Sequence, residues 1–406
     1  MTKGKRSKRS PKKAKDKKFE YHKLIGESKT IYYLKRIVGR GTFGVVYEAF
    51  SNDSLSEDNT KCTESDNDDE ISDKIIPSDF NNILTVRNYN NITNFNFNKD
   101  KFSIKRYFKS FNPKAAQIEL SILSYLNNKI NDNRILKIID GNYLEKSGDF
   151  FFVSPYFKHQ KFVDYFKIMS IEKIQIYMFQ LLSCIDRIHS VGIIHRDIKP
   201  DNFLFNVETN DCCLIDFGLS EIDIDSKIFE HLNKNNTTDE DYKILSKIQQ
   251  KSYRHKIGTR GYAPPEVIFF SPYQDGGVDI WGAGMIFLIL LSERNNIFNL
   301  NLFSKIESDS VKDVIPLIEL FGVERVVETA TKCRCNIYIG NKLSEYQIKG
   351  GINNLIVKKP RNNKELKLLN LGKDLLSKLL ELNFKKRITA SQALKHEFFK
   401  GIKIIN

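Results

Sequence analysis

Three glycines, Gly39, Gly41 and Gly44, are spaced so that a bend between two extended segments could approach phosphate groups. The segment fits the pattern Gly-x-Gly-x-x-Gly-x-Val, which ends here at Val46. The same glycine spacing occurs in dinucleotide-binding folds, where a helix follows and an acidic residue comes about twenty residues later. Because strand-forming residues follow Gly44, the sequence favours a glycine-rich hairpin that covers phosphates, with no Cβ atom in the way.

The strongest chemical signal is the run His-Arg-Asp-Ile-Lys-Pro-Asp-Asn from His195 to Asn202. An Asp-Phe-Gly motif follows, and its Asp216 stands 19 residues after Asp197. In this order, and together with the glycine pattern, these motifs resemble the signature set of the eukaryotic protein kinases. The resemblance implies an α+β, two-lobed kinase fold, with a small β-rich N-terminal lobe and a larger helical C-terminal lobe. It also implies ATP as substrate and Mg²⁺ as cofactor.

The resemblance assigns roles that suit phosphoryl transfer, which depends on positioning and charge neutralisation. Asp197 would orient the attacking hydroxyl and accept its proton. Lys199 would place a positive charge near the transferred phosphate. Asn202 and Asp216 would supply hard oxygen ligands for Mg²⁺.

A lysine and a glutamate upstream complete this set. Lys105, in Phe-Ser-Ile-Lys, occupies the place of the lysine in the family's Val-Ala-Ile-Lys. Glu119 matches the helix glutamate that holds this lysine. The alternatives are a solvated strand lysine and a surface glutamate, and the other motifs in register argue against them.

The resemblance further implies a pocket for the adenine. Val46 and Leu204 would lie above and below the base. Ser154 would lie at the back of the pocket, and Pro155 and Phe157 would lie in the segment that connects the lobes.

Other residues imply the substrate class and the scaffold. Lys199 and the Gly258-Thr259 pair imply serine/threonine rather than tyrosine specificity. Glu266, in Pro-Pro-Glu where the family has Ala-Pro-Glu, could pair with Arg387. Asp279, at the head of a nearly apolar segment, would anchor the backbone of the His195–Asn202 loop, since a buried carboxylate is costly unless it is hydrogen-bonded.

Hydrophobic periodicity outlines the elements that must position these residues. The resemblance to the protein kinases implies a kinase domain over residues 30–400, with an N-terminal lobe at 30–153, a hinge at 154–158 and a C-terminal lobe at 159–400. Ser170 is a candidate N-cap for a long helix. The expected strands lie within Ile31–Phe50, Phe102–Phe108 and Phe150–Tyr156, and the expected helices cover Pro113–Leu126, the segment after Ser170 and Asp279–Leu291.

Composition and charge limit the classes of protein to which the chain could belong. The chain has 406 residues and a formal net charge of +14. Its longest apolar run, Met285–Leu291, is too short to span a membrane, so we expect no membrane association. Six cysteines in a chain of this length indicate reduced thiols in an intracellular protein.

Much of the positive charge lies in a tail over residues 1–22. Residues 1–18 hold ten lysines and arginines and one acidic residue, so we expect this tail to be disordered. It could be a nuclear-import signal, a non-specific nucleic-acid arm or a solubilising tail. We therefore expect a nuclear protein and leave direct nucleic-acid binding open.

Insertions indicate a subfamily. Residues 51–98 are acidic and then asparagine-rich, and further polar insertions lie near 221–256 and 330–365. In carrying insertions at these places, the chain resembles the cell division cycle 7 kinases. Those kinases start DNA replication by phosphorylating the minichromosome maintenance helicase, and they require a Dbf-type regulatory subunit. The alternatives are another nuclear serine/threonine kinase of cell-cycle or signalling type and an inactive kinase-fold scaffold, although the residues that an inactive fold would lose are present.

A basic stretch gives a hypothesis about substrates. Between Lys251 and Tyr262 the chain carries four lysines and arginines and no acidic residue. We expect it to attract substrates with acidic residues beside the phosphorylated serine or threonine. The alternative is a solvated loop.

Overall fold

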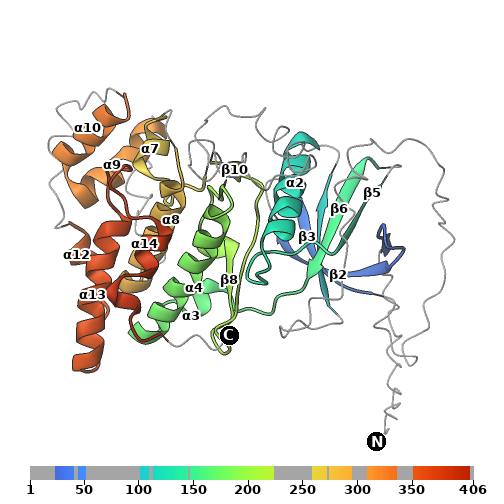
Figure 1. Cartoon of the computed structure of the whole chain (residues 1–406), viewed down its shortest axis with the longest axis horizontal. Helices are drawn as coiled ribbons and strands as arrows, with labels where there is room; N and C mark the ends of the chain where they lie inside the picture. The colour runs from blue at the N-terminus through green and yellow to red at the C-terminus, as the bar shows by residue number, and fades with distance from the viewer. Residues whose placement is uncertain are drawn as a thin grey trace, which may run out of the picture.

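A computed structural model describes residues 23–40, 44–51, 101–108, 113–144, 147–223, 258–271, 274–294, 309–335 and 351–402. The basic tail, Gly41, residues 52–98 of the acidic insertion and most of the 221–256 insertion lie outside the described residues. So do three of the four basic residues between Lys251 and Tyr262. The described segments form a β-rich N-terminal lobe and a helical C-terminal lobe (Figure 1). This arrangement confirms the two-lobed α+β fold.

The N-terminal lobe is built on one antiparallel sheet of six strands in the order β1-β2-β3-β4-β6-β5. Helix α2, Pro113–Lys129, lies beside this sheet (Figure 1). Successive side chains of β6 point to opposite faces of the sheet, and each face has its own hydrophobic cluster. Phe151 and Val153 pack in the cluster with residues of β2 and β3. Phe150 and Phe152 pack in the cluster that includes α2. The strands are β1 Lys23–Ile25, β2 Ile31–Arg40, β3 Val45–Ser51, β4 Phe102–Tyr107, β5 Asp140–Leu144 and β6 Asp149–Pro155.

Two of these strands, β1 and β5, were not predicted. Strand β5 begins Asp-Gly-Asn, residues that are more typical of turns than of strands. Asp140 is nonetheless buried, and it accepts hydrogen bonds from the Tyr32 hydroxyl at 2.9 Å and from Ser28. These bonds fasten the turn after β1 to β5, and they depend on contacts between segments more than 100 residues apart.

The C-terminal lobe is organised around α4, Ile171–His189, and α8, Gly277–Ser292. Ser170 caps α4 as predicted, accepting a hydrogen bond from the backbone N–H of Lys173 at 3.2 Å. Almost every residue of α8 is buried, so this helix runs through the core. The remaining helices are α3 Phe162–Tyr165, α7 Pro265–Ile268, α9 Asp309–Phe321, α10 Val323–Lys332, α12 Gly351–Leu355, α13 Asn363–Leu379, α14 Ala390–Leu394 and the 3₁₀ turns η4 Pro200–Asn202 and η6 Glu397–Phe399.

Four short strands lie between α4 and α7, where the sequence predicted mainly helices. They form two small antiparallel pairs, β7 with β10 and β8 with β9. The pairs hold the His195–Asn202 loop between them, because β7 ends just before it and β8 begins just after it. The strands are β7 Ile193–Ile194, β8 Phe203–Phe205, β9 Cys212–Leu214 and β10 Glu221–Ile222.

No helix within the described segments combines the length and apolarity needed to cross a bilayer. The five cysteines in the described part of the chain are free thiols, and four of them are buried.

Candidate active site

Three segments meet at Lys105, one of them more than 100 residues away in the sequence. Its ammonium lies 2.7 and 2.9 Å from the two carboxylate oxygens of Glu119 and 2.8 Å from Oδ1 of Asp216. Lys105 comes from β4, Glu119 from α2, and Asp216 from the loop after β9. The structure therefore brings together the lysine, the helix glutamate and one of the two predicted metal ligands.

The charges in this cluster perturb one another. Burial alone would lower the pKa of Lys105, but the carboxylates of Glu119 and Asp216 outweigh burial and raise it above its usual value. Burial alone would raise the pKa of Asp216, but Lys105 holds it below its usual value. In Glu119 burial dominates and raises the pKa, against the opposing effect of Lys105. Lys105 is thus held firmly in its charged form.

A second cluster forms around Asp197, which is 6% exposed. The ammonium of Lys199 lies 2.6 Å from Oδ2 of Asp197, and the amide nitrogen of Asn202 lies 3.0 Å from the same oxygen. Asn202 also donates to the backbone oxygen of Asp197 at 2.9 Å, which fixes the turn between them. The side chains of Lys199 and Asn202 therefore both hydrogen-bond to Asp197.

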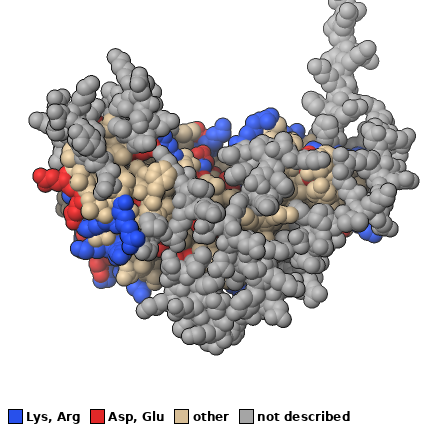
Figure 2. Space-filling view, turned by 90° about the horizontal axis from the view of Figure 1, so that it is seen from above, with Lys and Arg blue, Asp and Glu red and all other residues tan. Residues whose placement is uncertain are grey.

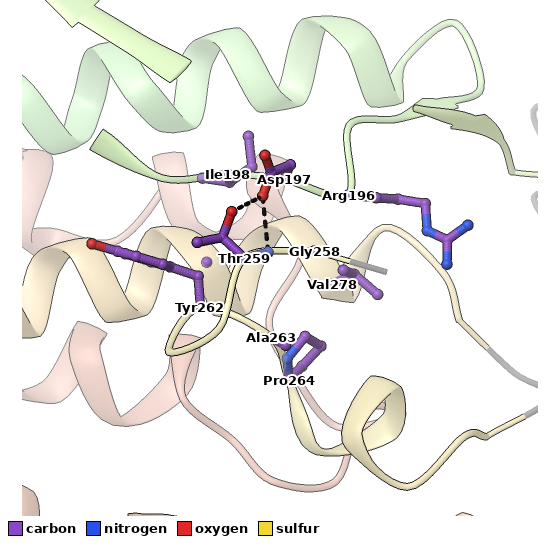
Figure 3. A pocket seen from close by; sticks show the side chains of 10 residues that line it. Arg196, Asp197, Ile198, Gly258, Thr259, Tyr262, Ala263, Pro264 and Val278 are labelled. Carbon is purple, nitrogen blue, oxygen red and sulfur yellow. Dashed lines mark hydrogen bonds between the residues drawn. The ribbon is translucent and has the colours of Figure 1, made fainter. Parts of the chain in front are cut away.

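Sequence reasoning missed one member of this cluster. Thr259 was singled out only for substrate class, yet its backbone N–H and its hydroxyl both donate to Oδ1 of Asp197 (Figure 3). Its hydroxyl oxygen also accepts from Lys199 at 2.8 Å. The Gly-Thr pair was the available signal, but the 62 residues between Thr259 and Asp197 hid the contact.

A small pocket adjoins Asp197 (Figure 3). It is lined by the His195–Asn202 loop, by Thr259, Tyr262 and Pro264 of the following segment, and by Val278 of α8. The pocket borders the carboxylate expected to receive the hydroxyl proton.

Asp279, in the first turn of α8, fastens the His195–Asn202 loop as predicted. It is fully buried, and it accepts the backbone N–H groups of His195 and Arg196 at 2.8 and 2.7 Å and the His189 ring nitrogen at 2.8 Å. Burial would raise the pKa of Asp279, but the hydrogen bond and charge of His189, together with His195, hold it below its usual value. The carboxylate stays ionised where it binds the loop backbone.

The side chain of Arg196 adds a further anchor. Arg196 has a left-handed backbone with φ of 67°, which a non-glycine residue adopts only when its surroundings enforce it. Its guanidinium donates to Glu221 of β10 and, at 2.7 Å, to the side-chain oxygen of Gln274. These contacts hold the loop on the side opposite Asp197.

The predicted pair between Glu266 and Arg387 is present. Both side chains are buried, with nitrogen–oxygen distances of 2.5 and 3.0 Å, and the guanidinium also lies 5.0 Å from the centre of the Trp281 ring. Pro264 occupies the N-cap position of α7 without disturbing this ion pair. The pair connects the segment after Thr259 to the C-terminal end of the domain.

Two glycines of the predicted phosphate-binding pattern are described: Gly39 lies in β2, and Gly44 directly precedes β3. Gly39 pairs with Val46, which in turn pairs with Lys105 on β4. The position of Gly44 requires glycine for a structural reason as well as for phosphate access, because an added Cβ would lie 2.2 Å from the backbone oxygen of Arg106. Gly44 is therefore packed directly against the strand that carries Lys105.

The predicted adenine-pocket residues come from both lobes. Val46 lies on β3, and Leu204 lies on β8, two residues after Asn202. Pro155 ends β6, and Phe157 follows it, with its ring stacked 6.4 Å from that of His159. The hydroxyl oxygen of Ser154 is buried and has no hydrogen-bond partner among the described residues.

The donor set suits Mg²⁺. Asp216 and Asn202 offer carboxylate and amide oxygens, and Lys105 occupies only Oδ1 of Asp216. Within the described segments no group of three or more histidine, cysteine or acidic side chains could hold a metal by itself. That fits an ion held by one or two side chains together with substrate phosphates. Asp216 also has a strained backbone, with φ of 64°.

Comparisons with known proteins agree with this site. Residues 96–399 match the family model described as protein kinase domain. The chain is 27% identical to the cell cycle protein kinase spo4 of Schizosaccharomyces pombe, over 94% of this chain and 89% of that protein. It is 31% identical to the cell cycle serine/threonine-protein kinase hsk1 of the same yeast, over 73% of this chain and 60% of that protein. It is 29% identical to the probable cell division control protein 7 homolog 1 of Encephalitozoon cuniculi, over 62% of this chain and 72% of that protein.

These similarities confirm the predicted resemblance to the cell division cycle 7 kinases. The family match over residues 96–399 covers the segments that supply Lys105, Asp197 and Asp216. The chain belongs to the protein kinase family, and it is an ATP-using serine/threonine protein kinase.

Proposed function

We propose that this kinase acts in the cell cycle to start DNA replication by phosphorylating the minichromosome maintenance helicase. The printed names of its relatives, two cell cycle kinases and a cell division control protein 7 homolog, support the cell-cycle assignment. The observation that carries the catalytic part is the geometry at Asp197, where Lys199, Asn202 and Thr259 all converge on one buried carboxylate.

The residues divide the work of phosphoryl transfer as follows. Lys105, fixed by Glu119, binds the non-transferred phosphates of ATP. Asp197 orients the substrate hydroxyl and accepts its proton, and Lys199 stabilises the negative charge that develops on the transferred phosphate. Asp216 and Asn202 hold Mg²⁺, which neutralises phosphate charge.

The glycine segment and the adenine-pocket residues bind the rest of ATP. Gly39, Gly41 and Gly44 lie over the phosphates, and Val46 and Leu204 enclose the adenine from the two lobes. Pro155 and Phe157 line the connection between the lobes. The Ser154 hydroxyl, which has no hydrogen-bond partner among the described residues, is a small polar group at the back of this pocket.

Protein substrates carry acidic residues beside the phosphorylated serine or threonine. The support is the basic stretch from Lys251 to Tyr262, and among its four basic residues only Arg260 is described. Arg260 lies 2.8 Å from the mostly buried carboxylate of Asp313, so part of its charge is compensated inside the protein. In Figure 2, basic and acidic side chains lie together at the C-terminal-lobe end of the described surface. The preference therefore depends mainly on Lys251, Arg254 and Lys256.

A Dbf-type regulatory subunit activates the kinase in the nucleus. The long insertions support a partner, because polar segments of this composition often fold on binding. The basic tail supports nuclear import.

The direct test is transfer of labelled phosphate from ATP to an acidic peptide from the helicase tail. The wild-type chain is assayed alone and with the Dbf-type protein of the same cell. We expect transfer to serine or threonine, and we expect it to fall by at least about 100-fold in Asp197→Asn, as for loss of a general base. Equal rates on peptides with acidic and with basic flanks would reject the acidic preference. Transfer to other nuclear proteins but not to the helicase would reject the replication assignment alone.

A further inference from the structure

Tyr107 lies two residues after Lys105 on β4. Because successive side chains of a strand alternate between its faces, these two side chains project from the same face, towards α2. Strand pairing places Lys105 opposite Phe152 and Tyr107 opposite Phe150 on β6. The residue between them, Arg106, instead forms an ion pair with Asp149.

The ring of Tyr107 is held rigidly. It is 2% exposed, and it stacks on the Phe150 ring with a centroid separation of 4.5 Å and an interplanar angle of 6°. The ammonium of Lys105 lies 5.1 Å from the centre of the Tyr107 ring, within the range of a cation–π contact. The aromatic stack therefore fixes where the hydroxyl can point.

That hydroxyl donates a hydrogen bond to Oε2 of Glu119. Glu119 is 1% exposed, and a buried carboxylate is costly unless enough donors surround it. Its other donor is Lys105, whose ammonium is shared with Asp216. Burial above all, and then Glu119, raises the pKa of Tyr107 well above its usual range, so this hydroxyl keeps its proton and remains a donor.

We propose that Tyr107 is a positioning residue for the Lys105–Glu119 ion pair. Its hydroxyl keeps Glu119 oriented while Lys105 turns between Glu119, Asp216 and the phosphates of ATP. The inference rests on the proposed role of Lys105 in binding phosphates. It concerns a residue that neither the motifs nor the comparisons assign.

The test is Tyr107→Phe, which removes the hydroxyl and keeps the stacked ring. We expect KM for ATP to rise, so that kcat/KM for ATP falls by about tenfold, a loss consistent with one hydrogen bond to a charged group. We expect KM for the peptide substrate to stay unchanged. A purely structural defect would instead lower the amount of active enzyme, which reduces kcat and leaves KM for ATP as it was.

Tyr32→Phe is the matched control. The Tyr32 hydroxyl also donates to a buried carboxylate in the same sheet, Asp140, at 2.9 Å, and it does not touch Lys105 or Glu119. We expect Tyr32→Phe to lower Tm and to leave kcat/KM for ATP unchanged. If both variants changed the ATP kinetics equally, or if Tyr107→Phe left them unchanged, Tyr107 would have no specific positioning role.

A double variant separates this inference from the proposed function. In a Glu119→Gln background, adding Tyr107→Phe should cost less than about threefold in ATP affinity, because the charged acceptor is already gone. Affinity for Mg·ATP, measured by calorimetry, needs no protein substrate. Failure of the wild type to phosphorylate the helicase peptide would therefore reject the proposed function, while the affinities would still decide the role of Tyr107.

Discussion

Thr259 gives two hydrogen bonds to one oxygen of Asp197, through its backbone N–H at 3.0 Å and its hydroxyl at 2.7 Å. The other oxygen of Asp197 receives Lys199 and Asn202. The carboxylate is thus fixed from two sides by residues of different segments. Its orientation towards a substrate hydroxyl depends on the segment that carries Thr259.

Thr259→Val keeps the shape of the side chain and removes its hydroxyl. We expect kcat to fall by about 10- to 100-fold, because a hydrogen bond to a charged group is lost and Lys199 loses its bridging partner. Thr259→Ser retains the hydroxyl, and we expect it to keep most of the activity. Steady-state kinetics on one peptide compares the three proteins, and an active Thr259→Val enzyme would contradict the positioning of Asp197 by this residue.

Asp279→Asn should destabilise the protein, since the carboxylate binds two backbone N–H groups of the His195–Asn202 loop and His189. The pKa of Asp279 is lowered in the folded state, so its contribution to stability is present above its unfolded pKa and is lost as the pH falls through the folded pKa. We expect wild type and variant to differ most near neutral pH, and we expect the difference to shrink as the pH falls below about 4. Urea unfolding across this range gives the comparison; a difference that did not depend on pH would count against an ionised anchor.

Two glycines of α8 give a paired test of packing. An added Cβ at Gly282 would lie 2.7 Å from the backbone oxygen of Ile198, next to Asp197. At Gly284 it would lie 2.6 Å from a terminal methyl of Leu380, a flexible side chain that can move. We therefore expect Gly284→Ala to reduce stability modestly and Gly282→Ala to reduce kcat strongly. The ratio of kcat loss to Tm loss should be clearly larger for Gly282→Ala, and equal ratios would show that this contact does not position the loop.

Short motifs made much of the site predictable from the sequence. Asp197, Lys199 and Asn202 stand within six residues, so their proximity follows from local chain geometry alone. Lys105 and Glu119 were assigned by resemblance, and their contact required α2 to pack on the sheet. Thr259 was assigned only to substrate class, and its contact with Asp197 arises where separate segments meet.

Tyr107 could not be predicted for a related reason. A tyrosine two residues after a strand lysine indicates only a shared face, and its hydroxyl reaches Glu119 because α2 covers that face. Strand β5 escaped prediction because Asp140, Gly141 and Asn142 favour turns locally. Its strand conformation depends on pairing with β6 and on the bond from Tyr32, which are non-local terms.

Asp216→Asn tests the proposed magnesium site. The substitution keeps the shape of the side chain and removes the negative charge, which Lys105 holds in its ionised form by lowering the pKa of Asp216. We expect the Mg²⁺ concentration that gives half-maximal activity to rise by at least about tenfold, the factor that corresponds to 1.4 kcal/mol of binding free energy. Chelation with EDTA should abolish activity of the wild type, and added Mg²⁺ should restore it.

Asp374→Asn is the control for this experiment. Asp374 is an exposed carboxylate on α13 that lies 2.7 Å from Lys378, so removing its charge should leave the Mg²⁺ dependence unchanged. The Asp216 carboxylate contributes one of the few hard ligands of an ion that otherwise relies on phosphates and water. A wild-type Mg²⁺ dependence in Asp216→Asn would therefore place the ion on other oxygens and would leave Asp216 only its contact with Lys105.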